Sequence, residues 1–272
     1  ATTAQPWMAG RRGRPYLVVC MPKNAEARDE VPGLNLPLGE MEKQRGRPRL
    51  HRYRVPVRGL HPAHEGLRIA HLSDLHVGIL TNHAFIRAAI QMAKAESPDL
   101  VLMTGDYVCY SPKFVGLLGE IVSGLTVPTV CVLGNHDYWT WGHGVAAQLQ
   151  HQQYDVLRNQ HTQLVLRGEP LVIVGVDDAA TRQADVERAF AGVPPHLTTL
   201  VLSHVPSTFD AIARHGPALT LSGHTHGGHV QIKGVTDRLF RKLGMPYIKG
   251  FYRQADSLLY VNCGVGSSSV PI

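Results

Sequence analysis

The sequence predicts a layered α/β protein in which two β-sheets share one core. Between residues 67 and 134, short apolar runs alternate with segments whose apolar residues recur three and four positions apart, as in amphipathic helices. After residue 160, most apolar runs are again of strand length, with two helical segments among them. A chain of 272 residues with 44% hydrophobic content is large enough to bury such a core.

The first half predicts a βαβαβ unit. Apolar runs that end in glycine or small polar residues predict strands over residues 67–73, 100–105 and 128–134. The amphipathic segments 83–95 and 113–125 lie between them, as crossover helices do. We therefore expect these three strands to be parallel.

The second half contains more strands. Residues 163–168 and 170–178 predict a hairpin, and two helical segments flank the next strand. The remaining expected elements are helix 184–191, strand 198–204, helix 205–216, and strands 218–223, 229–232, 247–254 and 258–264. We expect this half to end in antiparallel β structure, which indicates two sheets in one layered fold.

Positive charge is concentrated at the N-terminus. Residues 1–68 contain 13 Lys and Arg against 6 Asp and Glu, a net charge of +7, whereas residues 69–272 contain 14 against 15. Such a segment is attracted to anionic lipid headgroups or to nucleic acid, and a solvated, partly disordered arm is the alternative. We expect residues 1–48 to form a basic, partly irregular arm and residues 49–272 to form the folded domain.

Neither the apolar runs nor the cysteines add a further constraint. Uninterrupted apolar runs such as residues 100–103 are far shorter than the roughly 20 residues that a membrane span requires. The four cysteines have no CxxC spacing, and we interpret them as reduced thiols.

Five predicted strands are each followed by side chains that can bind metal. Ligand sites in α/β sheets lie beyond the carboxyl ends of strands, so these residues should meet at one edge. They are Asp74 and His76, Asp106, Asn135 with His136 and Asp137, His204, and His224 with His226. Taken singly, Asp-x-His occurs by chance, Gly-Asp is usually a turn, and a lone histidine is usually a core residue. Together, in this order, they predict a metal site.

These ordered motifs, SDLH, GDY, GNHD, SHVP and GHTHGG, resemble those of the calcineurin-like metallophosphoesterase superfamily. The resemblance runs from Leu67 to the C-terminus. In finer detail, the chain is similar to bacterial membrane-associated or exported phosphodiesterases. Some of those relatives cleave the pyrophosphate of a UDP-diacylglucosamine lipid precursor. The resemblance implies a four-layer α/β/β/α sandwich of two mixed sheets flanked by helices, with two metal ions.

The resemblance also implies roles for the motif residues. Asp74, His76, Asp106 and His226 match the ligands of the first metal; Asp106, Asn135, His204 and His224 match those of the second, so that Asp106 bridges. His136 matches the histidine that polarises the phosphate or protonates the leaving oxygen without binding metal. Asp137 either orients His136 or is a helix N-cap or turn residue.

The chemistry agrees with this ligand set. Two divalent ions about 4 Å apart can bind a phosphoryl oxygen and generate a hydroxide that attacks phosphorus in line. Carboxylate, amide and imidazole ligands suit Mn²⁺, Fe or Zn²⁺ better than Mg²⁺.

Two positions depart from close relatives: His229 stands where Gln is common, and Cys263 where Arg is common, which removes a possible phosphate contact.

We therefore expect a dinuclear-metal hydrolase of phosphodiester or pyrophosphate bonds, with a lipid-linked headgroup or nucleotide-sugar lipid among its candidate substrates. A nuclease or nucleotide phosphodiesterase and a non-catalytic metal-binding scaffold are the alternatives. Nucleic acid is the less favoured partner because the chain lacks a basic groove interleaved with aromatic residues. The basic arm favours a peripheral-membrane or cell-envelope location, with a cytoplasmic location as the alternative.

Overall fold

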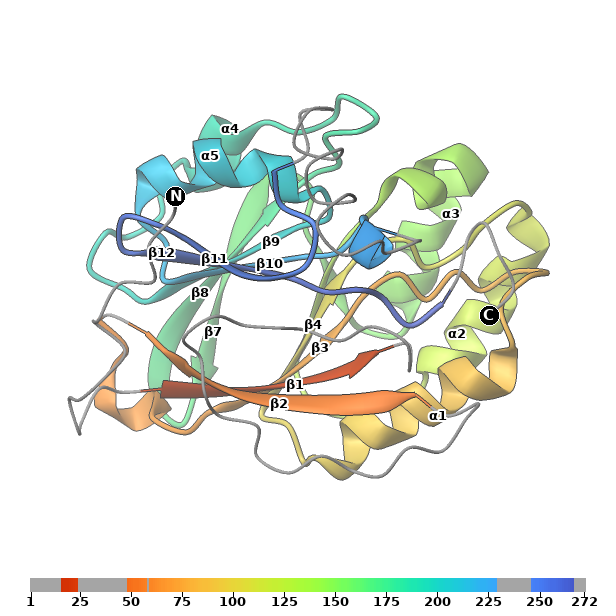
Figure 1. Cartoon of the computed structure of the whole chain (residues 1–272), viewed down its shortest axis with the longest axis horizontal. Coiled ribbons are helices and arrows are strands. Elements are labelled where there is room, and N and C mark those ends of the chain that lie inside the picture. The colour runs from red at the N-terminus through yellow and green to blue at the C-terminus, as the bar shows by residue number, and fades with distance from the viewer. Residues whose placement is uncertain (1–15, 24–47, 58, 229–245, 267–272) are drawn as a thin grey trace.

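Two six-stranded sheets pack face to face in the computed structural model, which describes residues 16–23, 48–57, 59–228 and 246–266 (Figure 1). The first sheet has the order β2-β1-β3-β4-β5-β6. Its strands are β1 (Tyr16–Lys23), β2 (Arg49–Pro56), β3 (Arg68–Leu72), β4 (Leu100–Thr104), β5 (Thr129–Val132) and β6 (Asp155–Val156). The pair β1–β2 is antiparallel and the other neighbours are parallel, so the sheet is mixed.

The second sheet has the order β11-β12-β10-β9-β8-β7. Its strands are β7 (Gln160–Leu166), β8 (Glu169–Val176), β9 (Thr199–Ser203), β10 (Leu219–Ser222), β11 (Gly250–Gln254) and β12 (Ser257–Val261). The hairpin β7–β8 and the edge pair β11–β12 are antiparallel, whereas β8, β9, β10 and β12 are parallel to one another.

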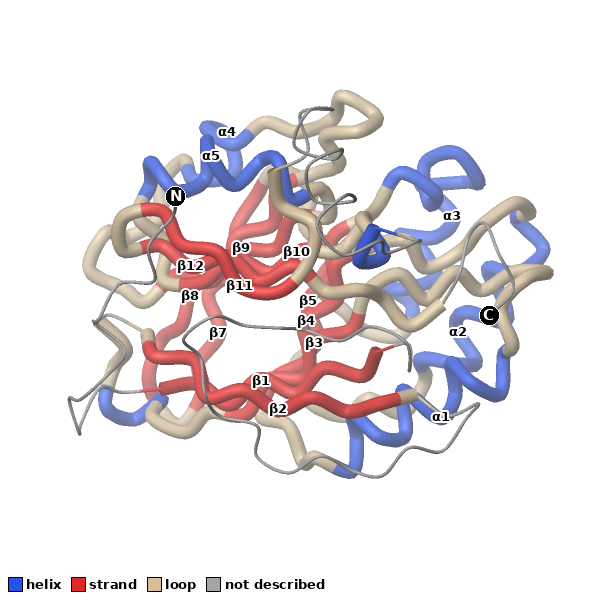
Figure 2. The backbone as a smooth tube through the Cα atoms, viewed as in Figure 1, coloured by secondary structure: helices blue, strands red, loops and turns tan. Residues whose placement is uncertain are grey.

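Helices cover the two outer faces, as Figure 2 shows. They are α1 (His83–Ala95), α2 (Val115–Val122), α3 (Asn135–His151), α4 (Val186–Phe190) and α5 (Phe209–Ile212). The first three cover the first sheet, and α4 and α5 cover the second. This arrangement confirms the expected four-layer α/β/β/α sandwich.

The two-residue period of the strands explains the layers. In β4, Leu100 and Leu102 point into the core between the sheets, while Val101 and Met103 point toward α1–α3. Both faces of the central strands are therefore buried, which is why they appear in the sequence as continuous apolar runs.

Strand β1 falls within the range expected for the N-terminal arm. It lies between β2 and β3, with backbone pairing on both sides. The basic segment that follows also contributes a strand, because Leu50, Tyr53 and Val55 of β2 are buried. Arg52, from the same strand, forms a two-pronged ion pair with Glu96 at 2.5 and 2.6 Å. Part of the N-terminal charge is thus used within the fold.

Three expectations need correction or lie outside the described residues. Strand β12 pairs in parallel with β10, so only its β11 side has the expected antiparallel arrangement. Helix α3 was not among the expected elements, and only the possible helix N-cap role of Asp137 pointed to it. The strand expected over 229–232 lies outside the described residues. Among the residues that are described, no helix is both long and apolar enough to cross a bilayer.

Candidate metal centre

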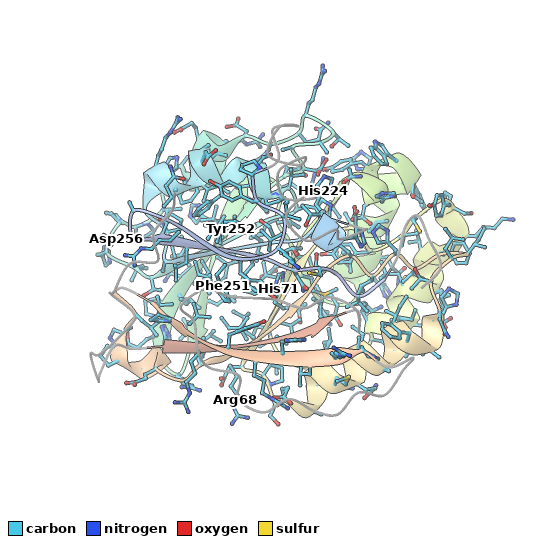
Figure 3. The ribbon with its side chains drawn as sticks, viewed as in Figure 1. Arg68, His71, His224, Phe251, Tyr252 and Asp256 are labelled. Carbon is cyan, nitrogen blue, oxygen red and sulfur yellow. The ribbon has the colours of Figure 1, made fainter. Side chains whose placement is uncertain are left out.

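The candidate site lies where strands of both sheets end. Asp74 and His76 follow β3, Asp106 follows β4, and Asn135 begins α3 just after β5. From the second sheet, His204 follows β9, and His224 and His226 follow β10. Figure 3 shows His224 beside the one-turn helix η6 (His226–Gly228). The parallel strands deliver these residues to one edge, as the sequence predicted.

The side chains form two groups that share Asp106. Asp74, His76, Asp106 and His226 offer ligand atoms that all lie within 4.8 Å of one another, and so do Asp106, His204 and His224. Asn135 Oδ1 lies 3.2 Å from His204 Nε2, which places this amide beside the second group. Asp106 Oδ2 lies 3.5 Å from His76 Nε2 and 3.3 Å from His204 Nε2, between the two groups.

Five of these residues have left-handed backbone conformations. Their φ values are 52° at Asp74, 46° at His76, 55° at Asp106, 73° at His224 and 48° at His226. Non-glycine residues rarely adopt such angles, and each costs on the order of 1 kcal/mol or more. Concentration of this strain at the converging side chains indicates that the loops are shaped for a site.

Backbone hydrogen bonds hold the loops against one another. The amides of Asp74 and His76 donate to the carbonyls of Gly105 and Asp106, both at 3.0 Å. The amide of His224 donates to Asp74 Oδ1 at 3.0 Å, which ties the two sheets together at this edge. His204 Nδ1 lies 2.7 Å from the carbonyl oxygen of Thr104. Because a carbonyl only accepts, Nδ1 carries the proton, and Nε2 is left to face Asp106.

The site is buried and electrostatically strained. Burial raises the pKa of Asp106, but the His204 imidazole lowers it well below its ordinary value. Burial lowers the pKa of His204, but Asp106 and Asp74 raise it to about 10. Burial and then the cationic His204 lower the pKa of His224 to about 4, and burial lowers that of His76 well below its ordinary range.

This donor set fits metal ions. Nε2 of His76 lies 2.9 Å from Nε2 of His226, so two nitrogen lone pairs converge unless one nitrogen is protonated. Asp74 and Asp106 are buried, and among the described residues their ion-pair partners are imidazoles. Buried carboxylates require positive charge nearby, and divalent cations would supply it in place of the proton on His204 when the imidazoles bind as neutral ligands.

His136 lies beside the groups without joining either of them. Its amide donates to Asp106 Oδ1 at 2.9 Å, and its ring meets the ring of His76 edge-on, with centroids 4.8 Å apart. The residue is half-buried, so part of it remains accessible from solvent. This position suits contact with a substrate.

Asp137 is a structural residue of the site. Its Oδ2 accepts from the amides of Gly134 and Asp106, both at 2.9 Å, and its Oδ1 accepts from those of Tyr107 and Val108 at 2.8 and 3.1 Å. The carboxylate thus joins the first turn of α3 to the loop after β4, which agrees with the turn or cap interpretation. The sequence signal is an acidic residue at the third position of a helix.

The sequence interpretation missed two residues after β8. Asp178 is buried and accepts from the amide and hydroxyl of Thr181, while its Oδ1 has no hydrogen-bond partner among the described residues. Its negative charge contributes to the raised pKa of His204, so it lies near the second group. Asp177 accepts from Tyr138 at 2.6 Å and Arg158 at 3.1 Å. The only signal was two acidic residues at another strand end.

The two positions that depart from relatives have different outcomes. Cys263 is buried beside the candidate site, where a side-chain carbon added to Gly227 would lie 3.0 Å from its sulfur. A buried thiol at this position cannot supply the positive charge that an arginine would offer to a phosphate. His229 lies outside the described residues.

Residues 67–228 match the calcineurin-like phosphoesterase family. The chain is 26% identical over 270 residues to UDP-2,3-diacylglucosamine pyrophosphatase LpxG of Chlamydia muridarum, covering 79% of this chain and 82% of that protein. It is 28% identical over 206 residues to phosphodiesterase YaeI of Escherichia coli, covering 74% and 75%. The crystal structure of a 5'-nucleotidase precursor from Thermus thermophilus has a similar fold, with a TM-score of 0.50 and 16% identity over 73% of this chain and 49% of that one.

The chain belongs to the calcineurin-like phosphoesterase family. It is a metal-dependent phosphoesterase, and its two side-chain groups around Asp106 indicate a site for two divalent metal ions. This confirms the family, the fold and the reaction class that the ordered motifs predicted.

Proposed function

We propose that the two groups each hold one divalent ion and that Asp106 bridges them. Asp74, His76 and His226 complete the first set of ligands, and Asn135, His204 and His224 complete the second. The position of Asp106 Oδ2 between His76 and His204 carries this proposal. The mixture of carboxylate, amide and imidazole favours Mn²⁺, Fe or Zn²⁺. Bound ions of this kind neutralise phosphoester oxygens and lower the pKa of bound water.

His136 acts on the phosphate or the leaving oxygen. Its amide is fixed by Asp106, and its ring lies against His76 at the edge of the two groups. An imidazole there can donate a proton to an oxygen that develops negative charge as the ester bond breaks. Asp137 does not orient this ring, because its oxygens are used by four backbone amides; instead it fixes the turn from which His136 projects.

The substrate is a phosphodiester or pyrophosphate attached to a lipid. Two observations support this class: the similarity to a lipid-precursor pyrophosphatase and a phosphodiesterase, and the net charge of +7 over residues 1–68. Basic residues near an anionic membrane each contribute about 1 kcal/mol of attraction. The N-terminal region therefore holds the enzyme at the membrane surface, in the cell envelope or as a peripheral protein.

Elemental analysis of Asp106→Asn tests the metal site. The variant should lose metal from both groups and lose turnover of bis-p-nitrophenyl phosphate. Asp177→Asn is the matched control, because Asp177 is also buried after a strand but belongs to neither group. Two metals per chain with normal turnover in Asp106→Asn would refute the bridging assignment.

Substrate class is tested by comparing metal-loaded turnover of bis-p-nitrophenyl phosphate, p-nitrophenyl phosphate, UDP-sugar lipids and DNA. Preference for DNA would favour a nuclease, and no turnover of any ester would favour a scaffold.

Membrane attraction is tested in the full chain, since a truncation at Arg49 would remove β1 from the sheet. Replacing Arg11, Arg12 and Arg14 by Gln should weaken binding to anionic vesicles at low salt, and unchanged binding would contradict the attraction.

A further inference from the structure

Strongly exposed apolar side chains gather beside the catalytic site, in the loops after β3 and β4 and in the first turns of α3. Among the described residues, five large apolar side chains are more than half exposed: Ile79 (75%), Val165 (68%), Trp139 (67%), Tyr110 (56%) and Trp141 (53%). Ile79 follows His76, Tyr110 follows Asp106, and the two tryptophans follow His136. Only Val165 lies elsewhere, on the edge strand β7. Scattered exposed residues are normal, whereas a cluster beside a site indicates a contact surface.

The loops after β3 and β4 lie side by side. Val77 and Val108 form a parallel bridge, and the Val77 amide donates to the Tyr107 carbonyl at 2.7 Å. One residue further on, Gly78 lies against Cys109, so closely that an added Cβ would be 3.0 Å from the Cys109 carbonyl oxygen. Ile79 and Tyr110 are the next residues of these two adjacent segments, and both are exposed.

Trp139 and Tyr110 meet at His136. The His136 ring centroid is 5.0 Å from that of Trp139 and 6.5 Å from that of Tyr110, and both contacts are edge-on. The same imidazole also contacts His76, with ring centroids 4.8 Å apart. A continuous series of rings therefore leads from the candidate metal ligands through His136 to the exposed surface.

The chemistry of this surface favours lipid over nucleic acid. Tryptophan and tyrosine are enriched where membranes meet water, since each has an apolar ring and a polar tip. Ile79, the most exposed of the five, has no ring on which a base could stack. In addition, residues 76–83, 106–111 and 134–141 contain no Lys or Arg that could follow a nucleic-acid backbone.

We propose that Ile79, Tyr110 and Trp139, here named the apolar rim, insert into the interface of an anionic phospholipid bilayer and place the metal centre over headgroup phosphoesters. This inference rests on the proposed function. It adds to the long-range attraction of the N-terminal charge a short-range apolar contact beside His136. The two contributions differ in their response to salt, because only the electrostatic one is screened.

Co-sedimentation with phosphatidylcholine–phosphatidylglycerol vesicles at high salt tests the apolar rim. Ile79→Ser should weaken vesicle partitioning about tenfold, the effect of withdrawing one large aliphatic side chain from hydrocarbon. Val165→Ser is the matched control, since Val165 is similarly exposed but distant in the fold, and it should bind like the wild type. Brominated lipids should quench tryptophan fluorescence, and Trp139→Phe should lose much of that quenching.

Three results would overturn the proposal: no partitioning of the wild type, equal partitioning of Ile79→Ser and wild type, or a vesicle-free dimer that Ile79→Ser dissociates. The last result would make the apolar rim a self-association surface. Turnover of soluble bis-p-nitrophenyl phosphate is measured on the same wild-type sample. If that turnover persists while partitioning fails, the apolar rim is wrong and the phosphodiesterase function stands. If turnover fails, the vesicle assay still decides the apolar rim.

Discussion

Gly134 leaves no space for a methyl group beside the shared carboxylate. It is the last residue before α3, and an added Cβ would lie 2.6 Å from the Asp106 amide nitrogen and 2.9 Å from the Asp106 Cγ. Its φ of −114° and ψ of 174° are open to any residue. The consequences of Gly134→Ala are therefore steric rather than conformational.

Relief of this overlap requires movement of the site. Favourable contacts between non-bonded atoms begin at about 3.5 Å, so one of the two loops must shift by roughly 1 Å. Asp137 Oδ2 binds both Gly134 N and Asp106 N, and it transmits the shift between them. Overpacking of this kind costs about 1–3 kcal/mol. Since Asp106 belongs to both groups, affinity for both metal ions should fall.

Gly116→Ala is the matched control for Gly134→Ala, because the same substitution should stabilise the protein there. Gly116 lies in α2, and an added Cβ would meet nothing within 4 Å. Alanine in a helix is favoured over glycine by about 0.5–1 kcal/mol, so this variant should be slightly stabilised. The assays are urea unfolding of the metal-free protein and elemental analysis after metal loading. A Gly134→Ala protein as stable as the wild type, with two metals per chain, would refute the close approach of Gly134 and Asp106.

Three further perturbations separate catalysis, structure and metal binding. His136→Ala should keep both metals while kcat falls about 10²-fold or more, as loss of a general acid does; metal loss measured by elemental analysis would instead make His136 a ligand. Asp137→Ala removes the acceptor of four buried amides and should lower the free energy of unfolding by about 3 kcal/mol in urea; a change below 1 kcal/mol would contradict its structural role. Chelation should lower the melting temperature, and added Mn²⁺ should restore it. At a hundredfold excess over Kd, the bound ion should raise the free energy of unfolding by about 2.7 kcal/mol, and a melting temperature insensitive to both treatments would argue against the metal centre.

The buried strands were predictable because each is apolar on both faces. A run such as 100–103, apolar at every position, can only be a strand buried between two layers. The polar residue that follows such a strand therefore lies at the sheet edge where a site forms. Strand β1 was missed because its apolar run lies within the arginine-rich N-terminal segment, and β2 because charged residues interrupt its apolar ones. In β2, Leu50, Tyr53 and Val55 are buried beneath an arginine-rich exterior, and Arg52 is neutralised by a glutamate distant in sequence.

Helix α3 could not be predicted from local pattern. Its first turn contains His136 and Asp137, which face the site and the neighbouring loop rather than a hydrophobic core. Its glycines accommodate other side chains: an added Cβ on Gly142 would lie 3.0 Å from the Tyr138 ring, and one on Gly144 would overlap the Trp141 ring. These contacts are between residues of α3 itself, and the backbone at Trp141 is not helical (φ −175°, ψ 74°), so local packing and a kink interrupt the helical periodicity.

The hydrogen bonds of Asp137 also join the metal centre to the apolar rim. Asp137 binds the amides of Asp106, Tyr107 and Val108 in succession, so the segment leading to Tyr110 is fixed to the residue that both metal groups share. Val108 in turn bridges to Val77, which fixes the segment leading to Ile79. Because one buried carboxylate holds these segments in a single frame, the proposed entry of the apolar rim into a bilayer would set the height of the metal centre above the headgroups. That height would then select substrate phosphates by their distance from the membrane as well as by their charge.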